Sequence, residues 1–166
     1  MKIDSGLGLR LRFLGRVIER ETRHLQYTDQ RLFGNLADPA HLLGELDSDP
    51  ILAERIDAFV SRFGRLQDTL ADKLIPSLLD ALGEPRGAAI DNLDRAERFG
   101  WIDSTEAWFT ARRLRNQMIH EYIEDRLLLL DALQAGHAFV PTLIMTATHL
   151  LQVVNQRLGP PPLNAA

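Results

Sequence analysis

The stretch that decides the fold is residues 50–83, PILAERIDAFVSRFGRLQDTLADKLIPSLLDALG. Its apolar side chains recur at steps of three or four residues: Leu52, Ile56, Phe59, Phe63, Leu66, Leu70, Leu74, Leu78 and Leu82. This spacing places them along one stripe of a helix, whereas a strand would need alternation by two. The charged residues between them, such as Asp68 and Asp72, are assigned to the polar surface. Pro76 interrupts the pattern without a backbone N–H, so it is expected to kink the helix or divide it.

The segments on either side of this stretch also have helical patterns. Apolar residues over 9–36 form a looser stripe and predict a first helix, which ends in the turn-rich stretch 38–50. After a break rich in glycine and proline, a short helix is expected from about Ala88 to Phe99. Gly100 would be the C-terminal stop of that short helix.

The second half of the chain predicts two more helices. Asp103 lies three residues before Glu106, a capping arrangement for a long helix over about 104–133. Gly136 is expected to break this helix, and Pro141 suits the first turn of the last one. The apolar run after Pro141 could lie buried in a bundle.

No segment shows convincing strand alternation, and no repeat of fixed period appears. The sequence therefore predicts an all-α fold, an antiparallel up-and-down helical bundle of four long helices plus one short helix across a corner. The 166 residues suit one domain, which is assigned to residues 1–158. Residues 159–166 (GPPPLNAA) are expected to form a flexible C-terminal tail.

Composition narrows the class of protein. Hydrophobic residues make up 45% and charged residues 25%, which excludes a disordered chain. The absence of cysteine excludes disulfides, thiolate zinc sites and a cysteine nucleophile. The net charge of -4 gives no global basic field, so a polyanion would have to be held by a local cluster of arginines.

The sequence also bears on location. The N-terminus lacks the apolar core of a signal peptide. No stretch is seen to approach the roughly 18 uncharged apolar residues of a membrane span. A soluble, cytoplasmic protein with no membrane contact is therefore expected.

The sequence matches neither the metal-binding motifs of helical bundles nor the glycine-rich motifs that bind nucleotides. A di-iron bundle needs two Glu-x-x-His pairs, and only residues 21–24 (Glu-Thr-Arg-His) have that spacing. A zinc-protease helix needs a second histidine one turn after His120, but that position is Glu124. No glycine-rich phosphate loop is present, so neither a metal nor a cofactor is expected.

The strongest cluster of chemistry-bearing side chains lies at residues 112–122, RRLRNQMIHEY. His120 can take or give a proton near neutral pH, and Arg115 can neutralise charge that grows on phosphoryl oxygens. Asn116, one turn before His120, can orient the imidazole or bind a phosphate oxygen. Arg115 and His120 differ by about 140° around the helix, so their convergence over one cleft relies on the flexible arginine stem.

Arg112 and Arg113 precede these residues and would raise the local positive potential for a polyanion. Together the set suits cleavage of an RNA phosphodiester without a metal. A plainer interpretation stays open, because arginine and histidine on a helix are often solvated or paired with nearby acids such as those within residues 121–125. Tyr122 in turn suits half-buried packing with a solvated hydroxyl.

Residues 115–122 (RNQMIHEY) resemble the Arg-x4-His-x-Tyr motif of the HEPN superfamily, and most closely its HepT-like branch, the toxin partners of MntA-type minimal nucleotidyltransferases. The resemblance extends back through residues 92–102 (NLDRAERFGWI) and covers about residues 50–135 in layout. It implies a helical bundle that dimerises with the motif helices near the two-fold axis. It also implies a metal-independent endoribonuclease acting on mRNA or tRNA, with Arg115 and His120 catalytic and Asn116 the accompanying polar residue.

The resemblance implies a means of regulation as well. Tyr122 corresponds to the tyrosine that the cognate nucleotidyltransferase antitoxin modifies with AMP, which adds negative charge and bulk beside Arg115 and His120. The implied assembly is a homodimer, within a larger hetero-oligomer when the antitoxin binds. Three functions stay open: an RNase toxin, a non-catalytic adaptor that binds the nucleotidyltransferase and presents Tyr122, and a structural bundle in which His120 is merely packed.

Overall fold

The computed structural model describes residues 3–34 and 41–159, except for the side chains of residue 43 and residues 121–123. All regular elements in this part of the chain are helices, which confirms the predicted all-α fold class. In chain order they are α1 (Ser5–Phe33), α2 (His41–Glu45), α3 (Pro50–Asp68), the π-helix η1 (Thr69–Leu74), α4 (Ile75–Ala81), α5 (Ala89–Arg98), α6 (Thr105–Glu124) and α7 (Arg126–Leu158). Of the predicted tail, only Gly159 lies within the described residues.

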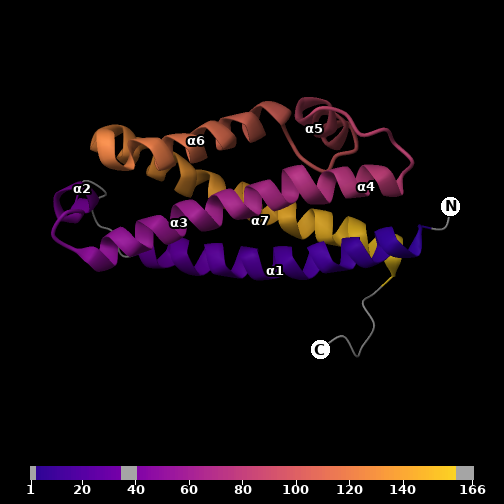
Figure 1. Ribbon diagram of the computed structural model, residues 1–166, viewed down its shortest axis with the longest axis horizontal. Helices are drawn as coiled ribbons and strands as arrows, with labels where there is room; N and C mark the ends of the chain where they lie inside the picture. The colour runs from indigo at the N-terminus through magenta and orange to yellow at the C-terminus, as the bar shows by residue number, and fades with distance from the viewer. Residues whose placement is uncertain (1–2, 35–40, 160–166) are drawn as a thin grey trace.

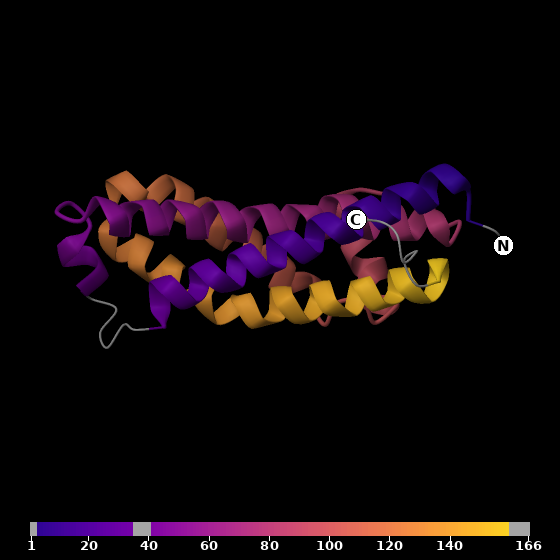
Figure 2. The same cartoon turned by 90° about the horizontal axis from the view of Figure 1, so that it is seen from below.

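Helices that are far apart in the sequence lie side by side. α1 packs against α3 and α7, and α6 packs against α7 and α3. Figure 1 shows that the chain reverses direction between α1 and α3 and again between α6 and α7, and that α1 and α6 lie along opposite edges of the molecule. Figure 2 shows the same elongated molecule from below, with α1 on the near side. The short helix α5 packs against α4 and α6.

The apolar stripe predicted from residues 50–83 forms the centre of the core. Seven of its side chains are no more than 1% exposed: Ile56, Phe59, Phe63, Leu66, Leu70, Leu74 and Leu78. Full burial of one such side chain stabilises the folded state by about 1.5–3 kcal/mol. The stripe therefore holds α3, η1 and α4 against α1, which all three contact.

Pro76 changes the type of helix without opening a gap in it. Just before Pro76 the chain forms η1, after which the N–H of Ile75 donates to the carbonyl of Leu70, five residues back. α4 then begins at Ile75, with the proline in its first turn. In an α-helix a proline ring clashes with the carbonyl four residues before it, and the wider π-helical turn relieves that clash. The predicted division of the helix is therefore a change of pitch within one continuous rod.

The largest difference from the sequence-based expectation is the position of the last turn. The predicted helix over 104–133 is cut at Asp125, where α6 ends and α7 begins. Asp125 has an extended backbone (φ -137°, ψ 106°). Its carboxylate accepts hydrogen bonds from the N–H groups of Leu127 and Leu128 at 3.1 and 3.2 Å. Those bonds satisfy donors that the first turn of a helix leaves free, so Asp125 is the N-cap of α7.

Gly136 and Pro141, predicted as a break and as a helix start, both lie inside α7. A Cβ at Gly136 would lie 3.3 Å from the end of Met118 and 3.4 Å from the Phe59 ring. Gly136 is therefore a point of close approach between helices and not a turn. Pro141 is exposed, so water can reach the carbonyl that its missing N–H leaves without a partner.

The connection between α5 and α6 follows the prediction more closely. Gly100, at φ 70°, comes just after α5, which confirms it as the C-terminal stop. The cap of α6 differs by one residue, because Ser104 Oγ accepts the N–H of Ala107 at 3.1 Å. Ser104, and not Asp103, is therefore the capping residue.

α7 carries no Asp, Glu, Lys or Arg between Asp131 and Arg157. By length and composition alone it could span a membrane: it holds an 18-residue window with a mean hydropathy of 1.5, of which 33% is buried in the fold. The expectation that no stretch approaches such a span is therefore corrected. α7 contacts α1, α3 and α6, so part of its apolar surface belongs to the core.

Replacing Asp125 by alanine tests the observed turn. Loss of the cap is expected to lower the free energy of unfolding by about 0.5–2 kcal/mol, as measured by urea denaturation. Asp125→Ser still offers an acceptor to the helix start and should keep most of the stability. In a helix continuous through this position alanine would be neutral or stabilising, because its helix propensity is the highest, and that result would contradict the turn.

Candidate functional site

A buried stripe on the inner side of α6 holds the candidate site in place. Trp108, Ala111 and Met118 are each no more than 2% exposed. Their spacing of three and seven residues puts them on one face of the helix. Met118 lies over Gly136 of α7, where the two helices pack. The remaining side chains of the predicted site therefore lie on the flanks and outer face of α6.

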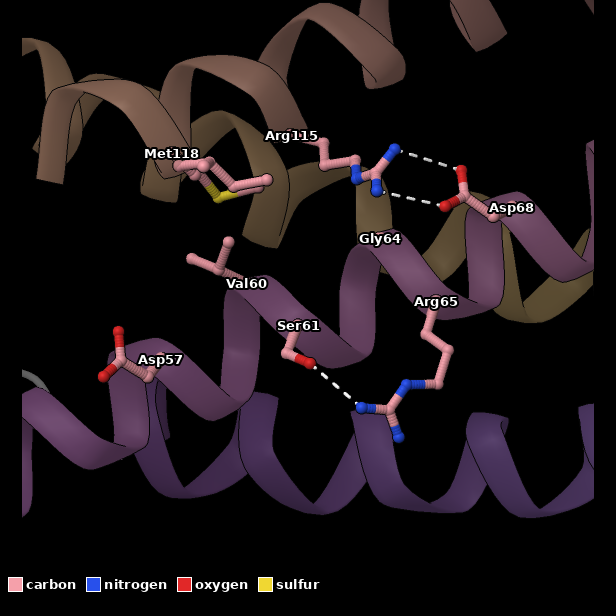
Figure 3. A pocket seen from close by; sticks show the side chains of 9 residues that line it. Asp57, Val60, Ser61, Gly64, Arg65, Asp68, Arg115 and Met118 are labelled. Atoms are coloured by element: carbon pink, nitrogen blue, oxygen red, sulfur yellow. Dashed lines mark hydrogen bonds and ion pairs between the residues drawn. The ribbon is translucent and has the colours of Figure 1, made fainter.

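Arg115 lies on the flank of α6 that faces α3. Its guanidinium meets the Asp68 carboxylate twice, with Nη1 3.2 Å from Oδ1 and Nη2 3.1 Å from Oδ2. Figure 3 shows this paired arrangement, with the arginine stem close to Gly64. Two parallel contacts of this kind are directional, so Asp68 fixes the orientation of the guanidinium.

Gly64 makes room for the arginine stem. A Cβ at this position would lie 2.6 Å from Nε and 3.1 Å from Cδ of Arg115. A larger residue would therefore displace Arg115 from Asp68. Gly64 lies within α3 and has no unusual backbone conformation. Glycine matters at this position because its missing side chain leaves space for Arg115.

A second ion pair runs beside the first. Arg112 Nη2 lies 2.8 Å from Oδ1 of Asp72 in η1. Asp68 and Asp72 are one turn apart, so the two pairs tie α6 to α3 and η1. Exposed pairs of this kind are worth only about 0–1 kcal/mol each, so they position the arginines more than they stabilise the fold. The positive potential expected from Arg112 is offset by this carboxylate.

Burial raises the pKa of Asp68 above its ordinary value of 3.8. Arg115 opposes this shift because a cation favours the carboxylate, while Asp72 adds to it as a like charge. The group that orients Arg115 is thus protonated more readily than an exposed aspartate would be.

The Arg115–Asp68 pair lies in a groove between α3 and α6 with a volume of about 510 Å³. Arg65 also lines this groove, but Figure 3 shows it directed away from Arg115, and it donates to Ser61 at 3.1 Å. Ile119, which is 50% exposed, adds an apolar side chain. The groove thus combines an ion pair with apolar surface open to solvent.

His120 lies elsewhere on α6. It is exposed and lines a second hollow, of about 450 Å³, together with Arg113 and Asn116. Among the described lining residues, Arg115 belongs to the groove at Asp68 and not to this hollow. The structure therefore brings His120, Asn116 and Arg113 together and separates them from Arg115. The expected convergence of Arg115 and His120 over one cleft does not occur within a single chain.

The second hollow has a chemistry of its own. An imidazole can transfer a proton, a guanidinium can attract a phosphate, and an amide can orient either one. The side chain of Tyr122 lies outside the described residues, although α6 runs through this position as helix. Its predicted role as a modification site therefore stays a prediction.

Sequence reasoning missed Gly64 and Asp68. Asp68 had no distinguishing spacing, since 47 residues separate it from Arg115 and only the packing of α6 on α3 brings them together. Gly64 did carry a signal, because glycine inside a strong helical pattern costs about 1 kcal/mol relative to alanine. Such a glycine indicates that something passes close to the helix.

Among the described side chains, which exclude those of residues 121–123, no group of three or more His, Asp or Glu is placed to hold a metal ion. The two residues of the Glu-x-x-His pair, Glu21 and His24, lie in different environments. Burial raises the pKa of Glu21, which lies beside Thr69 and Arg65, whereas His24 is exposed on the outside of α1.

Replacing Arg115 by methionine is expected to raise the pKa of Asp68 further, because this guanidinium is the strongest influence that lowers it. NMR titration of the Asp68 carboxyl carbon measures the change. Arg112→Met is the matched control, since its charge has a weaker effect on Asp68, and it should raise the pKa less. Equal shifts in the two variants would contradict the paired geometry.

The same pKa predicts a pH dependence of stability. Folding raises the pKa of Asp68, so the folded chain holds this proton more tightly than the unfolded chain does. The resulting stabilisation is full below the ordinary value of 3.8 and is lost as the pH rises through the raised value. The free energy of unfolding of the wild type, relative to Asp68→Asn, should therefore fall over this range in urea titrations. A difference that grows with pH would show the opposite shift.

No protein-family model, curated protein or solved structure matches this chain. Its function therefore has to be inferred from the geometry of α6 and its neighbours.

Proposed function

We propose that this chain is a metal-independent endoribonuclease toxin of the HepT/MntA type, with His120 as its acid–base group. The observation that carries the proposal is the hollow on α6, where the exposed imidazole lies with Asn116 and Arg113. The resemblance of residues 115–122 to the HEPN motif supports the same assignment. The proposed frame is an antiparallel up-and-down bundle, which the packing of α1, α3, α6 and α7 suits.

In the proposed reaction, the His120 imidazole removes the proton from a 2′-hydroxyl of RNA. The 2′-oxygen then bonds to the adjacent phosphorus, and the bond from phosphorus to the 5′-oxygen of the next nucleotide breaks. The protonated His120 then returns the proton to that oxygen, directly or through water, which leaves a 2′,3′-cyclic phosphate and a 5′-hydroxyl. Asn116 would orient the imidazole or hold a phosphate oxygen, and Arg113 would attract the RNA backbone.

Arg115 requires a dimer in this proposal, because in one chain it lines the groove at Asp68 while His120 lines the other hollow. A two-fold axis beside α6 would bring a second copy of both side chains to the interface. The Arg115 side chain is 30% exposed, so a substrate held between subunits could reach it. There it would stabilise charge growing on the phosphoryl oxygens.

Control by a cognate nucleotidyltransferase antitoxin belongs to the same proposal. Tyr122, two residues after His120 on α6, is the proposed acceptor of AMP. The added phosphate would bring negative charge to the catalytic helix and repel RNA. We propose mRNA or tRNA as the substrate, the cytoplasm as the location, and a hetero-oligomer with the antitoxin as the inactive assembly.

A non-catalytic adaptor that binds the nucleotidyltransferase is the second candidate. One observation favours it: Arg115 is engaged by Asp68 and does not share a hollow with His120. A helix whose arginine serves the packing of α6 on α3 could present Tyr122 for modification without cleaving RNA.

Cleavage of a fluorescent single-stranded RNA in the presence of EDTA tests the nuclease. His120→Ala is expected to lower the rate at least about 100-fold, since general acid–base catalysis contributes about 10²–10⁴-fold. His149→Ala, at an exposed histidine of α7, is the matched control and should cleave like the wild type. Equal activity in the wild type and His120→Ala, or loss of activity on chelation, would contradict the proposal.

Two further measurements separate the dimeric site from the adaptor. Mixing inactive Arg115→Ala and His120→Ala chains should restore part of the activity if one site uses Arg115 from one subunit and His120 from the other. The adaptor predicts no cleavage by any mixture. It predicts instead that the nucleotidyltransferase and ATP add the mass of AMP to the wild type and not to Tyr122→Phe, as read by mass spectrometry.

A further inference from the structure

The outer face of α1 carries a row of exposed side chains that includes both cations and large apolar groups. This row, the α1 stripe, consists of Leu9, Phe13, Arg16, Arg20, His24, Tyr27 and Arg31, which are all exposed. Its members follow each other at steps of three or four residues, so they lie within an arc of about 80° and extend over about 33 Å of the helix. The spacing therefore makes one continuous surface along α1.

The apolar members of the α1 stripe are open to solvent. Leu9 is 70% exposed, Phe13 is 56% exposed and Tyr27 is 58% exposed. Leu9 and Phe13 are one turn apart, and Tyr27 lies about 21 Å further along the same face. Exposed large apolar side chains on one face are candidates for contacts with a ligand.

The cations of the α1 stripe differ from those of α6. None of the ion pairs formed within residues 3–34 and 41–159 includes Arg16, Arg20 or Arg31. Arg112 and Arg115 of α6, in contrast, are each neutralised by an aspartate. In a chain with a net charge of -4, the α1 stripe is therefore a local positive surface.

The carboxylates of α1 lie outside the stripe. Asp29 contacts His137 of α7, with Oδ1 2.7 Å from Nδ1. Glu19 lines a hollow that includes Thr148 of α7. Glu21 is half-buried toward η1. Glu21 and Asp29 are thus directed to the sides of α1 that pack on other helices, and Glu19 is exposed beside α7.

Contacts within the fold hold two guanidinium groups in place at the C-terminal end of the stripe. The Arg31 guanidinium lies 5.6 Å from the centre of the Tyr27 ring, and its Nη1 donates to the tyrosine hydroxyl at 3.2 Å. Arg62 of α3 borders the stripe and donates to the carbonyl of His24 at 3.2 Å. A cation stacked on a ring and a second guanidinium at the edge form a partly preorganised surface for an anion.

We propose that the α1 stripe binds single-stranded nucleic acid, with phosphates on Arg16, Arg20 and Arg31 and bases stacked on Phe13 and Tyr27. A double helix would leave the two rings unused, because its bases are already stacked on one another. A second copy of this chain is a poor fit, since a two-fold contact would set cations against cations. A lipid surface favours apolar side chains collected on the side opposite the cations, and here both kinds share one arc of about 80°.

This inference goes beyond the cleavage proposed for His120 and does not depend on it. Figure 1 shows α1 and α6 along opposite edges of the molecule, so binding at the stripe and chemistry at α6 can be measured separately. Figure 2 shows α1 on the near side of the molecule, with no other helix in front of it.

The test is the fluorescence anisotropy of a labelled single-stranded RNA of about 20 nucleotides, longer than a typical single-strand site. The His120→Ala background prevents the proposed cleavage during the measurement. Arg16→Gln with Arg20→Gln should weaken binding at least about tenfold and lower the slope of log K against log salt by about 1.4, since each phosphate contact on a single strand contributes about 0.7. Arg95→Gln with Arg98→Gln removes the same charge from α5 and should leave affinity and slope unchanged.

A separate variant tests the proposed stacking of bases on the aromatic side chains of the stripe. Phe13→Ala should weaken RNA binding about tenfold through the loss of base stacking, with the salt slope unchanged because no charge is removed. Phe99→Ala, at an exposed ring beside α5, is the matched control and should bind like the background chain. Circular dichroism checks that each variant is folded.

The inference is overturned if both the double arginine variant and Phe13→Ala bind RNA normally. It is also overturned if vesicles containing phosphatidylserine bind more tightly than RNA, or if polyglutamate competes as well as RNA, since those results identify a membrane or an acidic protein as the occupant. RNA cleavage by the wild type together with normal binding by the stripe variants would remove this inference and leave the proposed nuclease standing.

Discussion

The close approach of α6 to its two neighbours is the constraint on which the candidate site depends, and two glycines permit it. Gly136 of α7 leaves space for Met118, and Gly64 of α3 leaves space for the stem of Arg115. A side chain at Gly64 would displace the Arg115 stem, and one at Gly136 would press on the end of Met118 and on the Phe59 ring, because a packed interior has few voids that could absorb the change. The same two contacts set how α6 is rotated and therefore which of its side chains reach solvent.

That rotation explains why the motif residues divide between two surfaces. Met118 is buried, so Arg115 falls on the flank toward α3 and His120 on the outer side. An arc of about 140° separates the two positions on α6, and Asp68 holds the Arg115 side chain on the α3 side. If the two act together, the second copy has to come from another subunit, and for that reason the proposed nuclease is inseparable from a dimer.

The arginines of this acidic chain are used in two different ways. On α6, Asp68 and Asp72 neutralise Arg115 and Arg112. These ion pairs orient the two guanidinium groups and connect α6 to α3 and η1. On α1, the exposed arginines have no such neighbours within their own face, and their field extends into solvent. Net charge alone conceals this difference, because it sums over surfaces that face opposite directions.

The sequence by itself determined that the chain is helical, which side of residues 50–83 is buried, and where α5 stops. These features follow from a local period of three to four residues and from the backbone freedom of Gly100, neither of which depends on distant residues. The tertiary structure alone decided that the last turn falls at Asp125, that Gly136 lies inside a helix, and that Asp68 is the partner of Arg115. Each of these depends on which helices pack together and how closely, and a one-dimensional pattern does not contain that information because the contacting residues lie far apart along the chain.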